Sequence, residues 1–148
     1  MRVLPQPVKP WSASVPKSAD VWYIDTSALV KTVVAEAESE ALQQWLTARP
    51  TLVACALIRV EAVRAVRLAD PALVTSVVRA IATLTLIRLD DSLLAAAADL
   101  QPPLLRSLDA IHLAAALRLG ADLAAVVTYD HRMAESAAAI GLRVAAPA

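Results

Sequence analysis

Residues 21–31, VWYIDTSALVK, carry the strongest indication of how this chain folds. The first four residues of this stretch are apolar, which is typical of a short buried strand, and Asp25 follows them directly. The segment Thr26–Val34 then has the composition of a helix. A buried strand that passes straight into a helix indicates an α/β fold.

The same alternation of strand and helix signals continues along the chain. Further strands are predicted at residues 51–54, 84–89, 123–129 and 142–146. Further helices are predicted at residues 38–48, 56–68, 71–82, 91–99 and 107–119, with a short one from His131. This order predicts a three-layer α/β/α sandwich, in which a central, mainly parallel sheet lies between two layers of helices.

The segment before the first strand differs from the rest. Residues 1–20 contain four prolines and no continuous apolar run, so we expect a flexible extension rather than a secretory signal. Residues 21–148 are then expected to form one domain. No apolar run approaches the ~20 residues of a membrane span, and the single Cys55 excludes an internal disulfide framework. These features predict a cytoplasmic protein without a membrane segment.

Four acidic residues lie where strands and helices meet loops: Asp25, Glu61, Asp109 and Asp130. In open parallel sheets the functional site lies beyond the carboxyl ends of the strands, where Asp25 and Asp130 are placed. If all four converge there, their like charges would raise one another's pKa. A bound Mg²⁺ or Mn²⁺ would remove this conflict, because such ions prefer hard oxygen ligands. The pattern therefore predicts metal-dependent chemistry on phosphates.

Each of these carboxylates also has a structural explanation when it is taken alone. Asp25 and Asp130 each precede a helix and would serve as N-caps. Glu61 would form a surface ion pair with Arg64, three residues further along its helix. Asp109 would interact with the helix dipole in the first turn of its helix. The functional interpretation depends on the convergence of the four.

Polar residues near these carboxylates are candidates for substrate contacts. The hydroxyls of Ser27 and Thr128, close to strand ends, would hydrogen-bond water or phosphate. The nearby guanidinium groups would hold the scissile phosphate or form solvated surface charges; they belong to Arg64, Arg106 and Arg132.

The two histidines also lie beside predicted site residues. His112 follows Asp109 by three residues, and His131 follows Asp130 directly. Nothing else in the sequence completes a site for a softer metal around them. We therefore expect both histidines to be structural or to support the carboxylates.

The charge balance is compatible with an RNA substrate. Lys and Arg number 14 and Asp and Glu number 14, so the net charge of zero at first argues against a nucleic-acid ligand. Eleven of the basic residues are Arg, the side chain best suited to bidentate phosphate contacts. If a metal neutralises the four carboxylates, 14 positive charges face 14 − 4 = 10 negative charges.

The order and spacing of four motifs resemble the PIN-domain family, and in particular VapC-type toxins. The motifs are YIDTSALVK, ALIRVEAVRA, LRSLDAIHLAAAL and VVTYDHRMAESAAAIGL, and the resemblance covers about residues 21–148. It implies a Mg²⁺- or Mn²⁺-dependent endoribonuclease that acts as the toxin of a type II toxin–antitoxin pair. The Pro-rich residues 1–20 depart from the family, whose members usually begin just before the first strand.

The resemblance also implies roles for individual residues. Asp25, Asp109 and Asp130 match metal ligands, and Glu61 matches the acidic residue of the second motif. Ser27 matches the small hydroxyl residue of the first motif. On this hypothesis the three aspartates hold one or two Mg²⁺, Glu61 completes the site or orders a water, and the activated water attacks an RNA phosphodiester in line.

Partners and an alternative function follow from the same resemblance. VapC-like proteins are expected to form homodimers and to be inhibited by a cognate VapB-like antitoxin. The main alternative is a degenerate PIN domain that binds RNA or a partner protein without catalysis, although all four acidic positions are occupied. A haloacid-dehalogenase-type phosphatase is disfavoured, because Ser27 stands where its D-x-D motif needs the second Asp.

Overall fold

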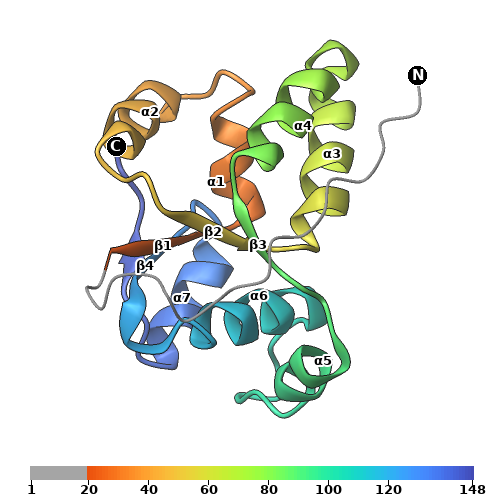
Figure 1. Ribbon diagram of the computed structural model, residues 1–148, viewed down its shortest axis with the longest axis vertical. Coiled ribbons are helices and arrows are strands. Elements are labelled where there is room, and N and C mark those ends of the chain that lie inside the picture. The colour runs from red at the N-terminus through yellow and green to blue at the C-terminus, as the bar shows by residue number, and fades with distance from the viewer. Residues whose placement is uncertain (1–19) are drawn as a thin grey trace.

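The apolar segments form one five-stranded sheet, shown in Figure 1. The computed structural model describes residues 20–148, so the predicted flexible extension lies, apart from Asp20, outside the described residues. All neighbouring strands are parallel, and their order in the sheet is β3-β2-β1-β4-β5. The strands are β1 (Val21–Ile24), β2 (Leu52–Cys55), β3 (Thr85–Ile87), β4 (Leu123–Val127) and β5 (Val144–Ala145).

Helices cover both faces of this sheet (Figure 1). The α-helices are α1 (Thr26–Lys31), α2 (Ser39–Thr47), α3 (Ile58–Ala69), α4 (Val74–Ala82), α5 (Asp91–Ala98), α6 (Ser107–Leu117) and α7 (His131–Ala139). Two 3₁₀ turns connect elements, η1 (Pro71–Leu73) and η2 (Gly120–Asp122). Helices α1 to α4 pack on one face and α5 to α7 on the other, which confirms the predicted three-layer α/β/α sandwich.

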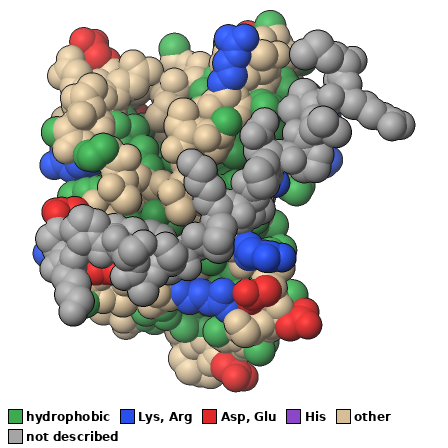
Figure 2. Space-filling model, in the orientation of Figure 1, with side chains coloured by type: hydrophobic (Ala, Val, Ile, Leu, Met, Phe, Trp, Pro, Cys, Tyr) green, Lys and Arg blue, Asp and Glu red, His purple; other side chains and the backbone are tan. Residues whose placement is uncertain are grey.

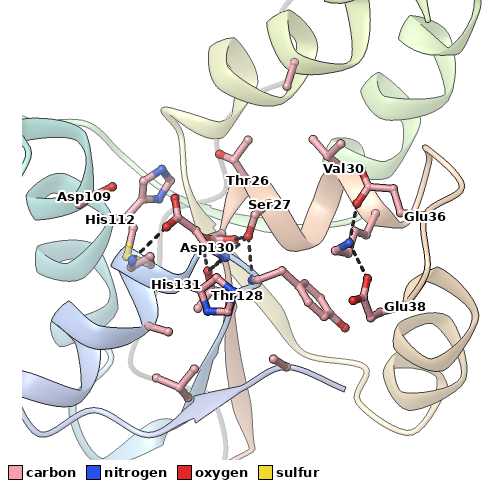
Figure 3. Close-up of a pocket in the computed structure, with 18 of the residues that line it drawn as sticks. Thr26, Ser27, Val30, Glu36, Glu38, Asp109, His112, Thr128, Asp130 and His131 are labelled. Atoms are coloured by element: carbon pink, nitrogen blue, oxygen red, sulfur yellow. Dashed lines mark hydrogen bonds and ion pairs between the residues drawn. The ribbon is translucent and has the colours of Figure 1, made fainter. Parts of the chain in front are cut away.

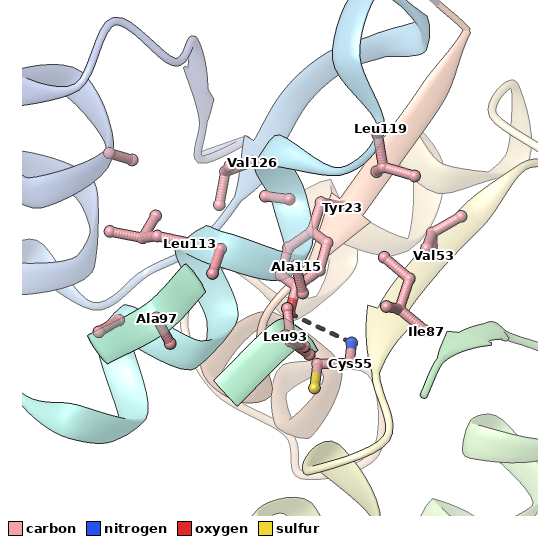
Figure 4. Close-up of a cluster of buried hydrophobic side chains, with 14 of the residues drawn as sticks. Tyr23, Val53, Cys55, Ile87, Leu93, Ala97, Leu113, Ala115, Leu119 and Val126 are labelled. Carbon is pink, nitrogen blue, oxygen red and sulfur yellow. Dashed lines mark hydrogen bonds between the residues drawn. The ribbon is translucent and has the colours of Figure 1, made fainter. Parts of the chain in front are cut away.

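Alternation along β1 supplies both halves of the core. Val21 and Tyr23 point into the cluster formed with α5, α6 and α7, which Figure 4 shows. Ile24 belongs to the second cluster, which it forms with α1 to α4. Successive strand residues point to opposite faces, so a strand that is covered on both sides reads as a continuous apolar run.

Element ends differ from the sequence prediction where tertiary pairing decides them. The strands β3, β4 and β5 are shorter than the predicted segments 84–89, 123–129 and 142–146, because each strand ends where its backbone pairing ends. The helix predicted to reach Val34 ends at Lys31, and the hydroxyl of Thr32 donates to the carbonyl of Leu29. The helix predicted over 71–82 begins with the 3₁₀ turn η1.

The centre of the sheet positions the site. β1 lies between β2 and β4, and Ile24 is in register with Val127. The backbone N–H of Asp25 donates to the carbonyl of Val127, with a length of 3.1 Å. The residues that follow β1 and β4 therefore lie side by side at the carboxyl edge of the sheet.

The surface view agrees with the balanced composition. On the face shown in Figure 2, acidic and basic side chains lie interspersed. Within residues 20–148, no helix is long and apolar enough to cross a membrane.

Candidate active site

An open cavity of about 680 Å³ lies at the carboxyl ends of β1 and β4 (Figure 3). Its lining includes all four predicted acidic residues: Asp25, Glu61, Asp109 and Asp130. They come from four different parts of the fold, namely the ends of β1 and β4 and the helices α3 and α6. The structure thus brings together carboxylates that are up to 105 residues apart, 130 − 25, in sequence.

Asp25 is the most buried of these carboxylates, with 4% of the residue exposed. Its Oδ1 accepts hydrogen bonds from Ser27 Oγ at 2.6 Å and from the backbone N–H of Ala28 at 3.1 Å. Its Oδ2 accepts from Thr128 Oγ1 at 2.6 Å. Burial raises the pKa of Asp25 although these donors oppose the shift. Asp25 is therefore the N-cap of α1 and a cavity carboxylate at the same time.

Asp130 combines the same two roles at α7. Its Oδ1 accepts from the backbone N–H groups of Arg132 at 2.9 Å and Met133 at 3.3 Å, so it is the N-cap of that helix. Asp109, in the first turn of α6, is half-buried. Burial raises the pKa of Asp109, and the negative charge of Asp130 adds to the effect. These two carboxylates therefore repel each other across the cavity.

Glu61 has different partners from those considered in the sequence. Its Oε2 accepts a hydrogen bond from Thr26 Oγ1 at 2.8 Å and lies 2.5 Å from His112 Nε2. Burial raises its pKa, but the hydrogen bond and charge of His112 and the hydroxyl of Thr26 outweigh burial and lower it. The alternative of an ion pair with Arg64 is wrong, because Glu61 pairs with His112 and Arg64 is exposed.

The two predicted hydroxyl residues hold the carboxylates in place. Ser27 Oγ donates to Asp25 and accepts the backbone N–H of Tyr129 at 2.9 Å. Thr128 Oγ1 donates to Asp25 and accepts the backbone N–H of Asp130 at 3.1 Å. Both side chains also line the cavity. They therefore fix the position of Asp25 and are placed to contact a ligand in the cavity.

The three predicted arginines differ in their positions. Arg106 and Arg132 line a smaller depression of about 250 Å³ beside the main cavity, together with Asp109. The positive charge of Arg106 lowers the pKa of Asp109, against the larger effects of burial and Asp130. Arg64 lines neither hollow. Two of the three guanidinium groups are thus placed beside the carboxylates.

The donor chemistry of the cavity fits a hard divalent cation. Asp25, Asp109 and Asp130 supply carboxylate oxygens, and hydroxyl groups surround them, which is the ligand type that Mg²⁺ and Mn²⁺ prefer. Within residues 20–148, no three His, Cys, Asp or Glu side chains lie close enough together to form a preformed cage.

Several residues of the site region were not found by sequence reasoning, among them Tyr23 and Lys31. Tyr23 Oη lies 2.7 Å from His112 Nδ1; a tyrosine in a strand predicted to be buried was the available signal, because a buried hydroxyl needs a partner. Lys31 lines the far end of the cavity, where its Nζ pairs with Glu36 at 2.5 Å and Glu38 at 2.7 Å. Figure 3 shows these two glutamates opposite Asp109.

Comparison with known proteins places this fold and site in a family. The family model for the PIN domain matches residues 22–139. The chain is 46% identical over 125 residues to Ribonuclease VapC46 of Mycobacterium tuberculosis (strain ATCC 25618 / H37Rv), a match that covers 84% of this chain and 96% of the relative. It is 45% identical over 129 residues to Ribonuclease VapC35 and 38% identical over 130 residues to Ribonuclease VapC47, both of strain CDC 1551 / Oshkosh, with the same coverage. The chain therefore belongs to the PIN-domain family, as a VapC-type member.

Proposed function

We propose that this chain is a metal-dependent endoribonuclease that acts as the toxin of a type II toxin–antitoxin pair. The observation that carries the proposal is the presence of Asp25, Glu61, Asp109 and Asp130 in one cavity at the carboxyl ends of β1 and β4. The relatives named Ribonuclease VapC46 and Ribonuclease VapC35 support RNA as the substrate class. Hydrolysis of an RNA phosphodiester is the reaction that this donor set suits.

The proposal assigns metal binding to three carboxylates. Asp25, Asp109 and Asp130 would hold Mg²⁺ or Mn²⁺, since all three line the same cavity. Burial and the negative charge of Asp130 both raise the pKa of Asp109, and a bound cation would offset both effects. When bound, the ion supplies positive charge for the phosphate and lowers the pKa of a water.

The remaining residues would orient the reactants. Ser27 and Thr128 hold the carboxylate of Asp25 through hydrogen bonds of 2.6 Å. Glu61, whose pKa is lowered by His112 and Thr26, lines the cavity and would accept a hydrogen bond from the attacking water. Arg106 and Arg132, beside Asp109, would contact the phosphates that flank the scissile bond.

The test is cleavage of total RNA by the purified protein with Mg²⁺ or Mn²⁺ and with chelator. We expect discrete products that need the metal, and a loss of at least about 100-fold in rate for Asp25→Asn. Glu135→Gln is the matched control, because Glu135 is an exposed residue of α7 that does not line the cavity. If the folded protein neither cuts RNA nor binds Mn²⁺, it is a non-catalytic PIN domain and the proposal is wrong.

The proposal includes two protein partners, a cognate VapB-like antitoxin and a second copy of the chain. The support for both partners is the membership of this chain among VapC-type proteins. Light scattering of the isolated protein tests the homodimer. To test the antitoxin, the chain is co-purified with the protein encoded by the neighbouring gene. We expect the complex to cleave RNA more slowly than the isolated chain.

A further inference from the structure

A chain of hydrogen bonds runs from the core to the cavity. The backbone N–H of Cys55 donates to Tyr23 Oη at 3.2 Å, which Figure 4 shows. Tyr23 Oη lies 2.7 Å from His112 Nδ1, and His112 Nε2 lies 2.5 Å from Glu61 Oε2. Thr26 Oγ1 donates to the same Glu61 oxygen at 2.8 Å. The chain thus joins β2, β1, α6, α3 and α1, and it ends on a carboxylate of the proposed active site.

When the His112 ring is neutral, the donors in this chain have one consistent direction, because one ring nitrogen donates and the other accepts. Tyr23 Oη accepts the N–H of Cys55, so its own hydrogen is left to donate, and the acceptor within reach is His112 Nδ1. With Nδ1 as the acceptor, the ring proton lies on Nε2 and donates to Glu61. The tyrosine hydroxyl therefore selects the tautomer that His112 presents to the cavity.

This chain of polar groups lies in a buried region, where apolar side chains would ordinarily be found. Tyr23 is fully buried and His112 is 3% exposed, and both lie among the aliphatic side chains around α6. Apolar residues would fill this space without needing partners, whereas each polar group here must be satisfied. The chain reaches solvent at its cavity end, where the Glu61 side chain is 21% exposed and Thr26 is half-buried.

We infer that His112, oriented by Tyr23, is a positioning residue that fixes the Glu61 carboxylate in the proposed catalytic cavity. Two donors on Oε2, His112 and Thr26, hold the carboxylate plane in one orientation. A water or substrate in the cavity would then hydrogen-bond to Oε1. A glutamate without this support would sample several rotamers. The inference rests on the proposed ribonuclease function, because it assigns Glu61 a task in that reaction.

The opposing explanation is that His112 is a buried residue whose hydrogen bonds only stabilise the fold and do not affect activity. Two substitutions separate the alternatives, because glutamine and asparagine place their amide nitrogen differently. In His112→Gln the amide nitrogen lies near the position of Nε2 and is able to donate to Glu61. In His112→Asn it lies near the position of Nδ1 and is too short to reach Glu61. Tyr23→Phe removes the hydroxyl that orients the ring.

The experiment measures kcat and KM for RNA cleavage together with the melting temperature. We expect His112→Asn to lower kcat about 10- to 100-fold, the usual effect of losing such a support, with KM changed less than about twofold. His112→Gln should recover most of kcat. The double variant His112→Asn/Glu61→Gln should be no slower than Glu61→Gln alone, because both changes remove one interaction.

Other outcomes overturn the inference. A purely structural histidine would lower the melting temperature equally in His112→Asn and His112→Gln without separating their kcat values. Multiplicative losses in the double variant, or an unchanged kcat in a folded His112→Asn, would show that the two residues act independently.

Failure of the proposed function has a different signature. If the wild type does not cut RNA, the proposed function fails, and the ¹³Cδ NMR signal of Glu61 still tests whether His112 positions this carboxylate. A shift of that signal in His112→Asn and Tyr23→Phe but not in His112→Gln supports positioning. An unchanged chemical shift in the wild type and all three variants would refute the positioning role of His112.

Discussion

The hydroxyl of Thr128 donates a hydrogen bond of 2.6 Å to Oδ2 of Asp25, across 103 residues of sequence. Thr128 follows β4 and Asp25 follows β1, and these two strands are neighbours in the centre of the sheet. Thr128 is 1% exposed, and its oxygen also accepts the backbone N–H of Asp130. A single threonine thus binds the carboxylate of Asp25 and the backbone N–H of Asp130, two residues that line the cavity.

Removal of this hydroxyl should destabilise the fold. Thr128→Val leaves the buried carboxylate of Asp25 and the N–H of Asp130 each without one partner. We expect the free energy of unfolding to fall by about 1–3 kcal/mol, as for other hydrogen bonds to buried charged groups. Urea denaturation measures the change. Thr128→Ser keeps the hydroxyl and should lose less; equal stability of Thr128→Val and wild type would show that the bond contributes nothing.

The ionised form of Asp25 should destabilise the metal-free protein at neutral pH. Its pKa is raised above the ordinary 3.8 in the folded state, so the folded protein binds more protons than the unfolded chain just above that pH. Stability contributed by the protonated form is therefore lost as the pH rises through the folded pKa. Asp25→Asn should raise the melting temperature at pH 7, and this gain should shrink as the pH approaches 3.8.

Glu61 should behave in the opposite way, because its pKa is lowered below 4.5. Its ionised form contributes stability above pH 4.5, and this contribution is lost as the pH falls through the folded pKa. Glu61→Gln should therefore lower the melting temperature at pH 7, where Asp25→Asn raises it. Thermal melts of both variants at several pH values check the prediction; shifts of the same sign at pH 7 would contradict it.

Divalent cations should stabilise the folded protein. A bound ion relieves the repulsion between Asp109 and Asp130 that contributes to the raised pKa of Asp109. At a Mn²⁺ concentration about 100 times Kd, binding to the folded state adds roughly 2.7 kcal/mol to the free energy of unfolding. Melts with increasing Mn²⁺ should show a rise in wild type and Glu135→Gln, and a smaller rise in Asp109→Asn. The same rise in all three would place the ion elsewhere.

Cleavage should leave a 3′-hydroxyl and a 5′-phosphate. Both ring nitrogens of His112 are engaged in the structure, so it is not available to activate a ribose 2′-hydroxyl. Hydrolysis by water needs no such activation, and RNA with a 2′-deoxy substitution at the scissile nucleotide should still be cut. End-group analysis of the products is the measurement. His131→Ala should give the same ends, because attack by a metal-activated water needs no histidine base, although His131 lines the cavity; 2′,3′-cyclic phosphate ends would rule out this mechanism.

The element order of this protein was predictable from local patterns. Apolar runs such as residues 21–24 and 123–127, followed by capping residues and Ala-rich segments, have the short-range periodicity of strands and helices. The three-layer arrangement follows from that alternation. The lengths of the edge strands β3 and β5 did not follow from it, because a strand ends where its pairing ends.

The sequence by itself determined which carboxylates stand at element ends, since a motif such as YIDTS carries its strand, its Asp and its hydroxyl together. Only the tertiary structure decided what each carboxylate contacts. Glu61 on α3 reaches His112 on α6 across 51 residues of sequence, although these two helices pack on opposite faces of the sheet. Helix and strand signals arise from neighbours within a few residues, whereas such a contact exists only once separate elements pack against one sheet.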